Sequence, residues 1–237
     1  MDQKTEIAEG ENSGNITFQG TLDVKLDNGE TITFPTLEVE RLTLYHGTGT
    51  SNVEEFKDSV ATTVGSGVYL TSSFDAGAGY SLLRTEHEGQ KFTVYEAEIK
   101  NMKLLDLTGA ESWALLGKIM APELEKAKNR TDFPADWQQY HKDAFHRHAT
   151  QALERITSGQ IRGPKDILYF FGGTARRLFS KLGFDGIKAL EGGEGWGEGL
   201  NNIEVGNHDT YVIFDPEKVK ILREVQIASH LPTAVPS

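Results

Sequence analysis

The sequence contains no cysteine among its 237 residues. Disulfide bonds, thiolate metal sites and cysteine nucleophiles are therefore excluded. Positive charge is also scarce, because 24 lysines and arginines stand against 35 aspartates and glutamates, which gives a formal net charge of −11. Such a field repels phosphate backbones and disfavours broad affinity for nucleic acid, although a local basic patch can still bind RNA or DNA.

Long apolar runs are missing too. The first residues, MDQKTEIAEGENSGN, are polar and acidic, so no signal peptide, lipidation motif or membrane span is predicted. We expect a cytoplasmic protein with no membrane partner, or one that acts in a host cytoplasm after delivery by another machine. Residues 1–14 are expected to be a disordered tail, because they bury too little apolar surface to offset the entropy of ordering. Residues 226–237 are expected to form a C-terminal tail.

Apolar residues are present in sufficient number for one sizeable core. They make up 38% of the chain, and 25 glycines suit a fold with many tight turns. Residues 15–40 predict an N-terminal β-hairpin, because Ile16 to Leu26 alternates apolar and polar residues and Asp27-Asn28-Gly29 supplies the turn.

The rest of the chain reads as short strands between modest helices. Strands are predicted at 42–45, 92–99, 184–187 and 210–214, and helices at 51–56, from a cap at Ser72 or Ser73 to Tyr80, over 110–158 and at 174–182. Pro122 and Pro134 are expected to break the 110–158 stretch. This mixture excludes a helical bundle and argues against regular βαβ winding, so the expected class is α+β.

Four segments stand out by their order and spacing. They are Tyr45-His46-Gly47-Thr48, then Gly65-Ser66-Gly67-Val68-Tyr69-Leu70-Thr71-Ser72-Ser73, then the turn of helix ending at Tyr80, and finally Asp209-Thr210-Tyr211-Val212-Ile213-Phe214-Asp215-Pro216 with residues 217–221 after it. Taken singly, each has an ordinary explanation: a histidine at a strand end is more often structural, and a lone tyrosine is more often a core aromatic.

Taken together, the segments resemble the ADP-ribosyltransferase superfamily, in the branch with a His-Tyr-Glu triad. That branch holds diphtheria toxin, the poly(ADP-ribose) polymerases and many phage and bacterial toxin-like domains. The resemblance spans about residues 42–222. It implies an ADP-ribosyltransferase-like split β-sandwich core with peripheral helices over residues 41–225, with a helical insertion at about 110–160.

The resemblance also implies that NAD is the substrate. Tyr69 and Tyr80 would hold the cationic nicotinamide ring between them by stacking and cation–π attraction. His46 would hydrogen-bond a ribose hydroxyl, and Gly47 would let its backbone approach the carboxamide. Thr48 and Ser72 are expected to add polar contacts.

The third residue of the triad departs from the family pattern. The slot just before the last aromatic-rich strand is commonly glutamate in the family, and here it holds Thr210. Thr210 can hydrogen-bond a ribose but cannot counter positive charge, and strand alternation should point the adjacent Asp209 to the opposite face. Three glutamates on or beside the glycine-rich loop are candidates to substitute: Glu194, Glu198 and Glu204.

The resulting hypothesis is a mono-ADP-ribosyltransferase, a glycosyltransferase with His46, Tyr69 and Thr210 as its catalytic residues. It would cleave the nicotinamide–ribose bond of NAD and transfer ADP-ribose to a protein, RNA or DNA acceptor. Two alternatives stay open: an NAD glycohydrolase, and a catalytically inactive module that binds NAD or ADP-ribose. A toxin or effector of this kind would also need an antitoxin or immunity protein as a partner.

Two further clusters have weaker functional interpretations. His141, His146 and His148 lack the i, i+4 spacing of a helical metal site, so no metal is expected and a solvated helix face is favoured. Arg176, Arg177 and Lys181 form a small basic cluster that could touch phosphate but usually faces water.

Overall fold

The computed structural model describes residues 15–26, 28–59, 64–83, 92–191 and 207–226. The strands in this part are β1 (Ile16–Lys25), β2 (Thr31–Thr48), β3 (Val68–Thr71), β4 (Thr93–Asp106), β5 (Gly186–Glu191), β6 (His208–Ile213) and β7 (Val219–Gln226). The helices are α1 (Phe74–Leu83), α2 (Ala110–Lys128), α3 (Gln139–Ser158), α4 (Lys165–Leu168) and α5 (Gly172–Lys181), with a 3-10 turn η1 (Pro216–Lys218) before β7. The predicted tail at 1–14, residues 227–237 and the three loop glutamates lie outside the described residues, whereas Gln226, predicted to begin the C-terminal tail, is the last residue of β7.

The strands form a sheet that closes on itself. Hydrogen bonds run from β2 to β3, β6, β5 and β4 in turn, and β4 pairs again with β2. All pairs are antiparallel except β4 with β5. β1 extends the sheet beside β2, and β7 extends it beside β4. The predicted α+β class is therefore confirmed, with β2 to β6 forming a closed sheet.

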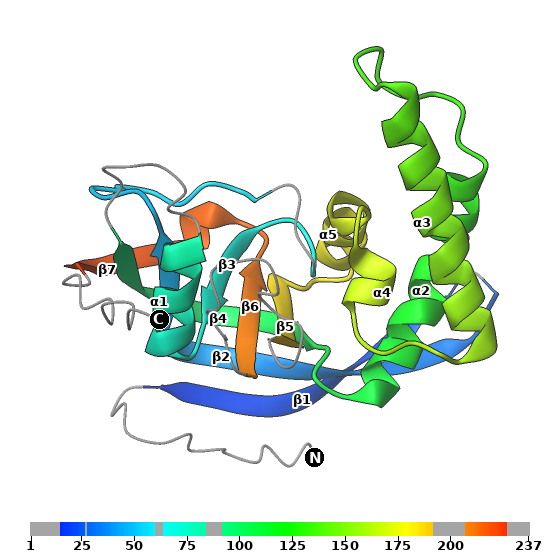
Figure 1. Cartoon of the computed structure of the whole chain (residues 1–237). Coiled ribbons are helices and arrows are strands. Elements are labelled where there is room, and N and C mark those ends of the chain that lie inside the picture. The colour runs from blue at the N-terminus through cyan, green and yellow to red at the C-terminus, as the bar shows by residue number, and fades with distance from the viewer. Residues whose placement is uncertain (1–14, 27, 60–63, 84–91, 192–206, 227–237) are drawn as a thin grey trace, which may run out of the picture.

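Two hydrophobic cores lie on the two sides of the strands. One fills the inside of the closed sheet and includes Leu44, Tyr95 and Tyr211. The other lies between the sheet and helices α2 to α5 and includes Val212 and Phe179. In Figure 1 these helices gather at one end of the sheet, whereas α1 lies toward the other end. Because side chains alternate along a strand, neighbouring residues of β6 enter different cores.

The strand β2 is longer than the sequence predicts. It runs without a break through the expected boundary at residue 40 and pairs with β4 from Thr36 to Thr48. The predicted helix at 51–56 is wrong. Asn52 has a left-handed φ of 56°, and its backbone N–H donates to Glu224 Oε2 at 2.7 Å, a contact to β7 that replaces helical hydrogen bonding.

The helical stretch also differs in one detail. Pro122 lies inside α2, which continues through it, whereas Pro134 falls in the predicted break, between α2 and α3. The buried face of α2, with Leu116, Met120 and Leu124, holds the helix on the core and offsets the loss of one backbone hydrogen bond. In the part of the chain described here, no helix has the length and apolar character needed to span a membrane.

Candidate active site

His46 lies near the end of β2, where that strand meets β3. Its Nδ1 atom is 2.7 Å from the backbone oxygen of Tyr69, and its ring packs on that of Phe56 with centroids 4.6 Å apart. The side chain is half-buried. His46 therefore contacts the backbone of Tyr69, and an aromatic contact and a hydrogen bond fix the orientation of the imidazole.

Tyr69 is fixed at its phenol end. Its hydroxyl donates to the Gly65 carbonyl at 3.0 Å and accepts from the Val64 N–H at 2.9 Å. These contacts tie the half-buried side chain to the loop before β3, and the ring packs at the edge of the core beneath the helices. A ring held in this way keeps a fixed plane, which is what a stacking partner needs.

Tyr80 reaches the same region from α1. Ser73 begins this helix as predicted, since its hydroxyl accepts from the Ala76 N–H at 3.2 Å. The Tyr80 hydroxyl lies 3.1 Å from His208 Nε2 and 3.5 Å from Glu191 Oε2. Burial above all, followed by the negative charge of Glu191, raises the pKa of Tyr80 far above its ordinary value.

Two other side chains act on the same phenol. The Tyr69 phenol is close enough to add to the rise in the pKa of Tyr80, and the Thr210 hydroxyl opposes it. No hydrogen bond of ordinary geometry joins Thr210 Oγ1 to a partner within the described chain, although the atom is buried. Tyr69, Tyr80 and Thr210 therefore belong to one cluster, in which the buried Thr210 hydroxyl lies beside the Tyr80 phenol.

Glu191 is the carboxylate that the sequence interpretation missed. Along β5 and β6, Thr210 pairs with Ala189, and Glu191 pairs with His208 two positions further along. Side chains two positions apart share a face, so Glu191 and Thr210 are diagonal neighbours, roughly 7–8 Å apart between Cα atoms. Glu191 is 7% exposed. The only sequence signal for it is the alternation Ile187, Ala189, Glu191, which the start of the glycine-rich loop conceals.

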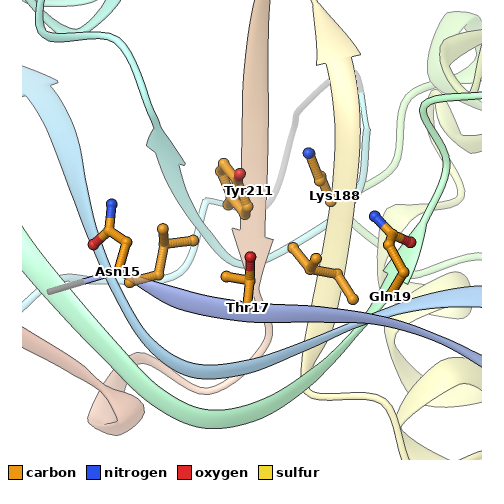
Figure 2. Close-up of a pocket in the computed structure, with 7 residues that line it drawn as sticks. Asn15, Thr17, Gln19, Lys188 and Tyr211 are labelled. Carbon is orange, nitrogen blue, oxygen red and sulfur yellow. The ribbon is translucent and has the colours of Figure 1, made fainter. Parts of the chain in front are cut away.

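The predicted position of Asp209 is confirmed. It points to the opposite face of β6 and pairs with Lys188 Nζ at 2.8 Å. On that face, a cavity of about 30 Å³ lies between Lys188 and Tyr211 on one side and Asn15, Thr17 and Gln19 on the other (Figure 2). This volume suits about one water molecule and is far below the 300 Å³ or so of a ligand pocket.

The structure shows why position 47 is a glycine, which the sequence did not reveal. A Cβ atom on it would lie 1.7 Å from the backbone oxygen of Gly77 in α1, so the glycine lets the helix rest directly on β2. The Thr48 carbonyl accepts from the Ser81 hydroxyl at 2.8 Å, which fastens the same helix. The Ser72 side chain is exposed, and its N–H donates to the Asp209 carbonyl at 3.4 Å.

The three histidines of α3 do not form a solvated face. His146 lies edge-on to Phe133, and His148 stacks on Phe170 with centroids 4.6 Å apart. His141 packs against Tyr140 and Trp137. Within the described ranges, no group of three or more histidines and carboxylates has the geometry of a metal site.

The arrangement has three chemical capabilities. Two phenol rings, from β3 and α1, can bind a flat cationic ring. An oriented imidazole can hydrogen-bond a sugar hydroxyl. The buried carboxylate of Glu191, beside the Tyr80 phenol, can stabilise positive charge that develops on a sugar carbon.

Comparison with known proteins gives a family match over most of the chain. The model of a family described as ADP-ribosyltransferase in polyvalent proteins matches residues 38–226. Among solved structures, the chain is similar to the crystal structure of the M. tuberculosis MbcT–MbcA toxin–antitoxin complex, with 13% identity and a TM-score of 0.39, over 81% of this chain and 87% of that one. No curated protein matches the sequence.

Proposed function

The chain belongs to the family of ADP-ribosyltransferases in polyvalent proteins, and we propose that it is an NAD-dependent mono-ADP-ribosyltransferase. NAD and an acceptor would give the ADP-ribosylated acceptor, free nicotinamide and a proton. The observation that supports this most directly is the cluster that Tyr80 of α1 forms with Glu191 of β5 and Tyr69 of β3. An antitoxin or immunity protein as a partner stays a prediction.

The residues have distinct roles in this proposal. Tyr69 and Tyr80 hold the nicotinamide ring, and the raised pKa of Tyr80 keeps its phenol neutral at all physiological pH values. His46, whose ring is fixed by its contact with Tyr69, hydrogen-bonds a ribose hydroxyl. Thr48 and Ser72 add polar contacts, and the backbone at Gly47 approaches the carboxamide.

Glu191 supplies the negative charge that the family's glutamate would carry and that Thr210 lacks. As the bond between the ribose carbon and the nicotinamide nitrogen breaks, the electron pair leaves with nicotinamide and positive charge develops on the ribose, as in glycoside cleavage. The Glu191 carboxylate stabilises that charge, and Thr210 offers its hydroxyl to the sugar. The acceptor nucleophile then bonds to the ribose carbon and loses its proton.

Nicotinamide release tests the site. The purified chain is incubated with labelled NAD and a cell lysate, and free nicotinamide and macromolecule-bound label are measured. We expect Tyr69→Ala and His46→Ala to abolish release, whereas Tyr140→Ala, which removes an exposed aromatic on α3, should leave it unchanged. Full turnover in both site variants would show that the site is placed wrongly. Quantitative release of free ADP-ribose with no bound label would indicate a glycohydrolase.

One observation favours a second candidate, a module that binds NAD without cleaving it. Thr210 occupies the slot that the family resemblance assigns to glutamate, and it is buried. Calorimetry with NAD separates the two functions, because a binding module would show heat of binding while no nicotinamide appears over hours.

A further inference from the structure

The charge of the chain is unevenly distributed along the sequence. Residues 139–181 contain eight lysines and arginines and three aspartates and glutamates, a local charge of +5 in a chain of net charge −11. This segment forms α3, α4 and α5, and α3 projects from the sheet beside α2 (Figure 1). A basic region on an acidic protein attracts anionic partners to one end of the molecule.

An aromatic platform lies on this basic region. We use this name for the rings of His148, Tyr169 and Phe170, whose centroids are 4.6 to 5.1 Å apart. Tyr169 is 41% exposed and Phe170 is 43% exposed, which is unusual for rings that have a core close by. Phe170 also has a left-handed φ of 71°, a strained conformation for a bulky residue. The chain thus holds Phe170 at the surface in spite of this backbone cost.

A hollow of about 380 Å³ adjoins the platform. It is lined by His148, Gln151, Arg155, Lys165, Asp166 and Tyr169. Asp166 anchors it by pairing with the Arg155 guanidinium and accepting from the Arg162 N–H at 2.9 Å. Lys165 and Arg147 are exposed, and neither forms an ion pair with any residue that the structure describes. Lys165, which lines the hollow, and Arg147, which adjoins His148 along α3, are the cations that an anionic ligand would contact.

His148 contributes a neutral aromatic ring to the platform and no positive charge. Burial, and then the positive charges of Arg147 and Arg155, hold its pKa below the ordinary value, so the imidazole is neutral at pH 7 and adds to the stacking surface. Flat neutral rings flanked by lysine and arginine match a ligand that alternates aromatic bases with phosphates. A carboxylate-rich peptide would use the cations but not the rings.

We propose that the aromatic platform and its neighbouring cations bind a single-stranded nucleic acid. A base stacks on Tyr169 and Phe170, and the adjoining phosphates contact Lys165 and Arg147. The platform and the NAD site are formed by different elements, so this proposal does not depend on NAD cleavage.

Fluorescence anisotropy without NAD tests the proposal on the full chain. Labelled oligo(dT) and oligo(rU) of about 12 nucleotides serve as probes. We expect binding of at least one probe, with a log–log salt slope of about −1.4, since each of two phosphate contacts on a single strand contributes about −0.7. Tyr169→Ala and Phe170→Ala should each weaken binding by about tenfold. Lys165→Glu should weaken binding and make the slope shallower by about 0.7.

Matched controls separate the platform from general effects of charge and aromatic content. Lys220→Glu makes the same change of charge as Lys165→Glu, but on β7. Tyr140→Ala removes an exposed ring from another part of α3. Both variants should bind the oligonucleotides as the parent does. Circular dichroism checks folding, and Phe170→Leu replaces Phe170→Ala if the latter unfolds. Binding of polyglutamate as tight as that of the oligonucleotides, or full affinity in both ring variants, would overturn the proposal. Loss of oligonucleotide binding in the Lys220→Glu control would also overturn the proposal.

Discussion

The Tyr80 phenol is influenced by burial and by the charge of Glu191 at the same time. Both destabilise the phenolate, so the pKa of Tyr80 is raised. The Glu191 carboxylate, which adds to this rise after burial, is also the group that the proposed mechanism uses to stabilise positive charge on the ribose. A neutral ring beside an anion suits a positively charged ligand, since a phenolate at this position would crowd two negative charges together.

Replacing Glu191 by glutamine should separate binding from catalysis. The amide keeps the size of the side chain but removes its charge, so we expect NAD affinity to be nearly unchanged and nicotinamide release to fall by about 100-fold or more. Single-turnover release and calorimetric titration with NAD measure the two quantities. Glu217→Gln, on the exposed turn η1, is the matched control. Unchanged release in Glu191→Gln would remove Glu191 from the mechanism.

The raised pKa of Tyr80 has a consequence at high pH. The phenol ionises more readily in the unfolded chain than in the folded one, so the free energy of unfolding should decrease as the pH rises above the ordinary tyrosine value of about 10. Ultraviolet titration of the parent and of Tyr80→Phe should differ by one late-titrating phenol among the seven tyrosines. Identical titration curves would contradict the burial argument.

At the scale of helices and strands, the sequence predicts those elements that a local pattern of residues specifies. Alternation locates the hairpin and most of the sheet, and Ser73 correctly begins α1. The helix predicted at 51–56 fails because a contact to β7, far away in sequence, determines the backbone at Asn52. Glu191 was missed for a related reason, since only the pairing of β5 with β6 shows that it shares a face with Thr210.

The packing of α1 on β2 gives a test of stability. Gly47→Ala would place its Cβ 1.7 Å from the Gly77 carbonyl oxygen and 2.7 Å from the Ser81 nitrogen. Both atoms belong to the backbone, so no side-chain rotation relieves the overlap and α1 must move away from the strand. We expect a loss of about 2 kcal/mol or more in the free energy of unfolding, measured by denaturant titration.

Gly163→Ala is the control for this test, because no heavy atom lies within 4 Å of the added Cβ. Its stability should equal or slightly exceed that of the parent, since alanine restricts the unfolded chain. Equal stability of the two variants would show that α1 does not rest on Gly47.

At the scale of the whole molecule, the two proposed sites divide the fold between them. The closed sheet and α1 form the NAD site, and α3 to α5 form the nucleic-acid platform. Most of the negative charge lies outside residues 139–181, so an anionic strand is repelled by the rest of the surface and attracted to this end. A net charge of −11 therefore does not by itself favour a protein acceptor, because what steers a strand is the distribution of charge.

We therefore expect the strand bound at the platform to be the acceptor as well, and Lys165→Glu tests this by its effect on steady-state kinetics. A docking contact made equally in the ground state and the transition state affects KM alone. The KM for a single-stranded acceptor should rise by about tenfold, while kcat and acceptor-independent nicotinamide release stay unchanged. Nuclease, and not protease, should remove the transferred label. A protease-sensitive label, or an acceptor KM unaffected by Lys165→Glu but raised by Lys220→Glu, would show that the acceptor reaches the NAD site by another route.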